Sequence, residues 1–95
     1  MKIPSVVKVG AHRVKVKYPY FFPDNAKDGV YNSNVKTIYI SGDCDPLITF
    51  WHEVVHVVDE VYNNDGLTEE QVLRLSEGLY QVLADNFKMR AKSQK

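Results

Sequence analysis

DPLITFWHEVVHVVDEVY, residues 45–62, is the stretch of this 95-residue chain that decides its fold. Asp45 followed by Pro46 is typical of a helix N-cap and first turn. At about 100° per residue, the apolar side chains fall on one side of this helix, and the polar ones, including His52 and His56, fall on the other. We therefore expect an amphipathic helix over residues 45–63 whose apolar side packs on a sheet and on a second helix.

The sequence before this helix predicts strands. In Val6–Val9 and His12–Tyr18, β-branched residues dominate and alternate with basic ones, which is the pattern of a half-buried β-hairpin. Gly29–Tyr31 and Thr37–Ile40 flank the turn-prone residues 32–34 and predict a second strand pair. The sheet region therefore spans residues 1–44.

A second helix is predicted after the first. Thr68, with Gln71 three residues later, forms a capping box that predicts a helix over residues 68–87. The tail that follows, residues 88–95, holds four basic residues and no acidic one. The chain is thus predicted to be a single α+β domain over residues 1–95, in which a small twisted sheet packs on two helices.

The composition excludes several classes of protein. Twelve Lys and Arg balance 12 Asp and Glu, so net charge gives no support for binding nucleic acid or an acidic membrane. Cys44 is the only cysteine, which excludes an internal disulfide and a Cys-rich zinc finger. No apolar run approaches the roughly 18 residues of a membrane span, and the first residues lack the apolar stretch of a signal peptide. We expect a cytoplasmic protein that is a monomer or a weak homodimer.

His52-Glu53-Val54-Val55-His56 predicts a metal site on the first helix. Histidines four residues apart share one helix face, so their ring nitrogens can converge on one Zn²⁺ ion per chain. Glu53 is offset by one residue and can flank the metal without binding it. It is therefore the predicted general base, which takes a proton from a water that zinc makes acidic.

The third ligand is left open by the residues alone. A catalytic zinc site has three protein ligands, and His12, Asp59 and Glu77 are the candidates. Glu77 projects to the edge of the apolar side of the last helix, where a partly buried carboxylate needs a partner. Asp59 lies on the same face as His56 and suits a role in orienting a ligand or the last helix.

The residues from Ile48 to Asn86 resemble the gluzincin group of zinc metallopeptidases. The resemblance rests on the metal motif and on the pattern of residues 68–79, and its nearest form is the single-domain minigluzincins of phages and bacteria. It implies a peptidase that hydrolyses peptide or protein substrates. By position, it implies His52 and His56 as ligands, Glu53 as general base, and Glu77 as third ligand on a "glutamate helix". It also implies that Thr37–Ile40 is the edge strand that pairs with an extended substrate.

Two departures from the gluzincin pattern leave a second function open. Ser76 and Gln81 stand where longer gluzincins often carry Asn and Asp, and a C-terminal subdomain with its oxyanion donor is missing. The alternative function is a catalytically weak or latent zinc-containing regulatory or binding module of phage origin. The basic tail, residues 88–95, could inhibit the site, and Cys44 precedes the helix as a conceivable redox switch. The tyrosines that could stabilise an oxyanion are Tyr31, Tyr39, Tyr62 and Tyr80.

Overall fold

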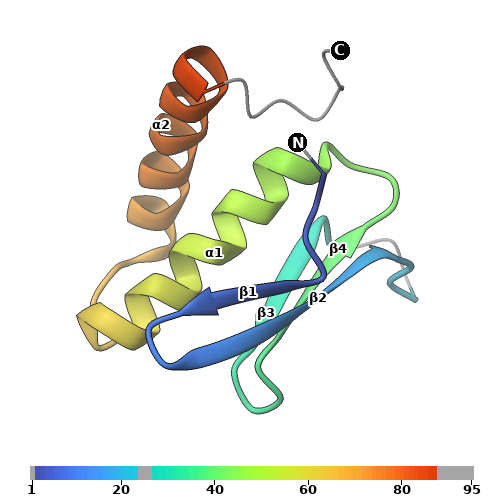
Figure 1. Ribbon diagram of the computed structural model, residues 1–95, viewed down its shortest axis with the longest axis horizontal. Coiled ribbons are helices and arrows are strands. Elements are labelled where there is room, and N and C mark those ends of the chain that lie inside the picture. Colours follow the sequence, from blue (N-terminus) through green and yellow to red (C-terminus); the bar gives the residue numbers. More distant parts are fainter. Residues whose placement is uncertain (1, 24–26, 88–95) are drawn as a thin grey trace.

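The computed structural model describes residues 2–23 and 27–87 and shows a four-stranded mixed sheet with two helices (Figure 1). The predicted α+β fold is confirmed. Its elements in chain order are β1 (Val6–Val9), β2 (His12–Tyr20), β3 (Gly29–Asn32), β4 (Thr37–Ser41), α1 (Pro46–Asn63) and α2 (Glu69–Phe87).

The period-two pattern of the sequence reappears in β2. Val14 and Val16 are buried on the side of the sheet that meets α1, whereas Arg13, Lys15 and Lys17 are exposed. Both predicted strand pairs form, since β1 pairs antiparallel with β2 and β3 pairs antiparallel with β4. The two pairs join through β2 and β4, which run parallel.

This parallel pairing corrects the expectation for Thr37–Ile40. The sheet order is β1-β2-β4-β3, so β4 lies between two strands, and β1 and β3 are the edge strands. All of β4 is buried except the partly buried Tyr39, as expected of an interior strand. Residues 29–32, and not residues 37–40, therefore carry the unpaired strand edge beside α1.

The predicted start of α1 is confirmed. The Asp45 carboxylate accepts hydrogen bonds from the backbone N–H groups of Leu47 (3.2 Å) and Ile48 (3.3 Å), and Pro46 begins the helix. α1 lies across one face of the sheet, where it contacts β1, β3 and β4 (Figure 1). The buried core between them consists of Val9, Val14, Val16, Ile38, Ile40, Phe50, Val54 and Val57.

α2 packs against α1 and has few buried residues of its own (Figure 1). Its capping box forms as predicted, because Thr68 N–H donates to Gln71 Oε1 (2.8 Å) and Gln71 N–H donates to Thr68 Oγ1 (3.1 Å). Only Val72, Ser76 and Ala84 are buried along the helix. The basic tail, residues 88–95, lies outside the described residues. Neither described helix is long and apolar enough to cross a membrane.

Gly29 lets the edge strand come close to α1. A Cβ atom at this position would lie 2.5 Å from Thr49 Cγ2 and 3.3 Å from Glu53 Oε2. Any side chain would therefore push β3 away from the helix that carries the histidines. At Gly78, on the outer side of α2, an added Cβ would meet nothing within 4 Å.

We predict opposite effects for the same substitution at these two glycines. Gly29→Ala should lower the free energy of unfolding by about 1–3 kcal/mol, because the methyl group overpacks the β3–α1 contact. Gly78→Ala should raise it by about 0.5–1 kcal/mol, because alanine favours a helix. Urea unfolding of both variants measures the difference. Equal stability of the two variants would contradict the close approach of β3 to α1.

Candidate metal centre

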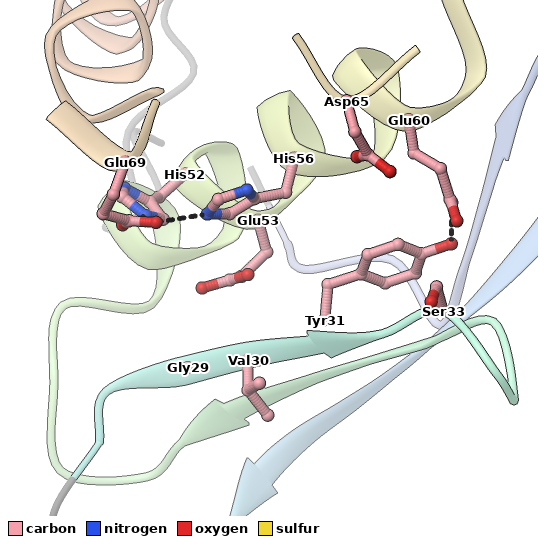
Figure 2. A pocket seen from close by; sticks show the side chains of 10 residues that line it. All are labelled: Gly29, Val30, Tyr31, Ser33, His52, Glu53, His56, Glu60, Asp65 and Glu69. Atoms are coloured by element: carbon pink, nitrogen blue, oxygen red, sulfur yellow. Dashed lines mark hydrogen bonds and ion pairs between the residues drawn. The ribbon is translucent and has the colours of Figure 1, made fainter. Parts of the chain in front are cut away.

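His52, His56 and Glu69 form a group that could hold a metal ion. His52 Nε2 lies 2.9 Å from Glu69 Oε2, and His56 Nε2 lies 3.1 Å from Glu69 Oε1. One candidate ligand atom from each residue lies within 4.8 Å of the others. Figure 2 shows the Glu69 carboxylate, at the start of α2, beside both imidazole rings of α1. The two predicted histidine ligands are therefore brought together as the four-residue spacing requires.

The chemistry of this group fits a divalent cation. An imidazole lone pair and a carboxylate oxygen that face each other at 2.9 Å must have a proton or a cation between them. Tetrahedral coordination at about 2.0–2.1 Å separates ligand atoms by about 3.3 Å, close to the separations between Glu69 and the two rings. Two imidazoles and one carboxylate are also a donor set that zinc accepts.

The structure does not bring Glu77 to the histidines. Glu77 is exposed on α2, and Glu69 occupies the position beside the rings that the resemblance gave to Glu77. Eight residues separate the two glutamates, which places Glu77 about 12 Å further along the helix axis. His12, another candidate, lies on β2 and is not part of the group. The sequence reasoning missed Glu69, although the capping box at Thr68 already placed it in the first turn of α2.

Ser76 lies beside the His52 ring. Its buried hydroxyl donates to the carbonyl oxygen of Leu73 (3.0 Å) and lies 3.4 Å from His52 Nδ1. A neutral imidazole carries one N–H, and His52 Nε2 already lies 2.9 Å from Glu69 Oε2. With a metal on Nε2, the Nδ1–H would donate to the Ser76 oxygen, so Ser76 is placed to orient the His52 ring.

Asp59 fixes the connection between the helices instead of binding the metal. Its buried carboxylate accepts from the Asn63 side-chain amide (2.9 Å) and from the backbone N–H of Leu67 (3.2 and 3.3 Å). Its carbonyl oxygen accepts from Asp65 N–H (3.0 Å). These bonds hold the turn that leads into α2. Asp59 therefore determines where α2 starts and, with it, the position of Glu69 beside the rings.

Glu53 is a buried carboxylate beside the metal group. Its side chain is 5% exposed and makes no hydrogen bond or ion pair with any described residue. Burial, and then the negative charge of Glu69, raise the pKa of Glu53 to about 7, against a smaller opposing effect of Lys27. A carboxyl group with a pKa near neutrality can both take up and release a proton at physiological pH.

The cleft extends along β3 on both sides of Glu53. One part has a volume of about 380 Å³ and is lined by residues of β3, α1 and the start of α2 (Figure 2). The other, about 460 Å³, is lined by Lys27 and by apolar groups that include Ile48 and Leu73. Gly29, His52 and Glu53 line both parts. The metal group therefore lies near the middle of a groove beside the edge strand.

Tyr31 is the one predicted tyrosine whose side chain lines this cleft. Its hydroxyl donates to Glu60 Oε1 (2.8 Å), and burial together with Glu60 and Asp65 keeps its pKa above the ordinary range. Of the other candidates, Tyr39 packs on Tyr20 and Tyr62 is 70% exposed. Tyr31 therefore remains a protonated hydroxyl that faces the cleft.

Cys44 does not have the environment of a reactive thiol. It is partly buried, its Sγ lies 3.3 Å from Thr49 Oγ1, and burial raises the pKa of the thiol. The nearby start of α1 does not overcome this effect. A small structural residue is therefore the better interpretation of Cys44.

Comparisons of the chain with protein-family models, curated proteins and solved structures find no significant match. The function is therefore inferred from the residues and geometry of the site.

We predict that Glu69, and not Glu77, determines metal affinity. In zinc titrations of the metal-free protein, Glu69→Gln should bind zinc more than about a hundredfold more weakly than the wild type. Loss of a direct ligand weakens metal binding more than loss of a group that only orients a ligand. Glu77→Gln removes the same charge from the same helix and should bind zinc as the wild type does. A large loss in Glu77→Gln with normal binding by Glu69→Gln would contradict the geometry.

We predict a pH-dependent stability difference between the metal-free wild type and Glu53→Gln. A carboxyl group whose pKa rises from 4.5 to about 7 on folding does not destabilise the folded state below pH 4.5. Above pH 7 it lowers the free energy of unfolding by its full amount. Glutamine removes this cost, so Glu53→Gln should be more stable by about 3 kcal/mol at pH 8 and equal to the wild type near pH 4. Glu70→Gln, at an exposed ion pair with Arg74, is the control and should change stability by less than about 0.5 kcal/mol. A difference that does not vary with pH would exclude a raised Glu53 pKa.

Proposed function

We propose that the protein is a zinc-dependent peptidase that hydrolyses peptide bonds in extended substrates. The observation that carries this proposal is Glu53, a buried carboxylate without a partner, placed directly beside the His52, His56 and Glu69 group. A structural metal site has no need of such a group, because desolvation and the nearby charge of Glu69 disfavour its ionised form and so destabilise the fold at neutral pH. Its cost is explained if Glu53 handles a proton during catalysis.

The position of β3 at the edge of the sheet favours an extended peptide as the substrate. β3 pairs with β4 along one edge, no described strand pairs with its other edge, and it runs along the cleft beside Glu53. A peptide that adds to this edge forms backbone hydrogen bonds whatever its side chains are. Because the two parts of the cleft flank Glu53, residues on both sides of the scissile bond can be accommodated.

The chain's own residues perform binding, orientation and proton transfer. His52, His56 and Glu69 would hold the ion, and Ser76 would accept from His52 Nδ1–H when Nε2 binds it. A zinc ion held there supplies a Lewis acid for the peptide carbonyl and makes water a better nucleophile at neutral pH. Glu53 accepts the proton of the attacking water and then gives it to the leaving amine.

Digestion of a mixed peptide library tests the proposal. The zinc-loaded wild type should produce defined cleavage products by mass spectrometry, and removal of zinc by a chelator should stop the reaction. Glu53→Gln should retain zinc and lose cleavage by at least about a hundredfold, because it cannot accept the proton.

Two outcomes would overturn the proposed peptidase activity. Undiminished cleavage by Glu53→Gln would exclude Glu53 as the base. Stable binding of peptides by the zinc-loaded wild type without any product would favour the alternative, a zinc-containing binding module that is latent or inactive.

A further inference from the structure

The cleft has a second polar end, away from the metal group. There Tyr31 from β3, Glu60 from α1 and Asp65 from the turn between the helices face one another (Figure 2). These side chains have no role in holding a metal or in handling a proton. Glu60 and Asp65 place negative charge next to the edge of β3 with which no described strand pairs.

The cleft is strongly acidic in one of its two parts. The part of the cleft that contains Tyr31 is lined by four carboxylates, those of Glu53, Glu60, Asp65 and Glu69, and by no described lysine or arginine, whereas Lys27 lines the other part. A divalent ion beside Glu69 would balance two of these charges. Lys36 offsets part of the charge of Glu60, so the remaining negative charge at this end lies on Asp65 and on the other oxygen of Glu60.

Glu53 shows that this cleft is built to receive a ligand. A solvated acidic patch would leave its carboxylates in water, whereas Glu53 is 5% exposed, has no partner among the described residues and points into the same cleft (Figure 2). A buried carboxylate with no partner within the protein needs one from outside. The acidic end lines the same cavity as Glu53 and is continuous with that site.

The two outer carboxylates can accept a cation. Lys36 Nζ already lies 3.6 Å from Glu60 Oε1, the same oxygen that receives the Tyr31 hydroxyl. No described residue bonds the other oxygen of Glu60. The exposed Asp65 carboxylate also has no hydrogen bond or ion pair with a described residue.

The alternation of strand side chains directs a substrate side chain to this end. Tyr31 points toward α1, whereas Val30 points to the opposite face (Figure 2). In a strand paired with β3, the residue opposite Tyr31 directs its side chain to the same face as Tyr31. A long side chain at that position reaches the neighbourhood of Glu60 and Asp65.

We propose that the end of the cleft formed by Tyr31, Glu60 and Asp65 is a subsite for a lysine or arginine side chain of the bound peptide. The inference rests on the proposed function only in taking the ligand to be an extended peptide. It assigns the protein a preference for basic substrates, set on one side of the metal group.

Binding by zinc-loaded Glu53→Gln tests the subsite without requiring hydrolysis. The probes are fluorescein-labelled octapeptides of Thr, Ala and Gln in which arginine, or its neutral isostere citrulline, is placed at each position in turn. Fluorescence anisotropy at low salt should show arginine bound about three- to tenfold more tightly than citrulline at one or two positions, and salt should weaken the preference.

Variants of the two carboxylates locate the effect. Adding Asp65→Asn or Glu60→Gln should reduce the arginine preference to about twofold or less, while Glu70→Gln, outside the cleft, should leave it unchanged. Asparagine suits the positive φ of residue 65 (56°), so the turn is retained. Lys36→Met should increase the preference, because it removes the cation already near Glu60.

The outcomes separate this proposal from the peptidase. Equal binding of arginine and citrulline peptides at every position, no binding of any peptide, or a preference that survives both carboxylate variants would overturn the subsite. An arginine preference that depends on Asp65 and Glu60, together with no cleavage by the wild type, would support the subsite and overturn the peptidase.

Discussion

The buried carboxylate of Asp59 is the constraint on which the arrangement of the site depends. It accepts the backbone N–H of Leu67, two residues before Glu69, and the side-chain amide of Asn63 at the end of α1. α2 cannot be placed by packing alone, since few of its residues are buried, and the Glu69 side chain is itself 71% exposed. The position of Glu69 therefore follows from the turn that Asp59 holds. An exposed ion pair alone contributes too little to determine it.

The groups of the proposed active site come from three elements that meet at one place. α1 provides two imidazoles and Glu53, the start of α2 provides Glu69, and β3 provides an unpaired backbone edge. The contact that joins β3 to α1 is close enough that position 29 has no room for a side chain. These three elements thus surround the candidate metal group on several sides.

Local signals made much of this structure predictable. The N-cap at Asp45, the capping box at Thr68 and the alternation in β2 act over a few residues, and all three form as expected. The convergence of His52 and His56 follows from helix geometry alone.

Two features depend on long-range contacts and could not be predicted in this way. The edge position of β3 arises because β2 and β4 pair in parallel, and nothing in either strand specifies that partner. The choice of Glu69 over Glu77 depends on where α2 starts relative to α1, which the bonds of Asp59 determine. The burial of Glu53 could not be predicted from the sequence either, because a helix projection gives the direction of a side chain and not the groups that cover it.

The most direct test of this account is the position of zinc in crystals of the zinc-loaded protein, measured by anomalous diffraction at the zinc absorption edge. We expect one strong peak per chain, about 2.0–2.2 Å from His52 Nε2, His56 Nε2 and a carboxylate oxygen of Glu69. A peak coordinated by Glu77 or Asp59 in place of Glu69, or a zinc ion away from the two histidines, would contradict it.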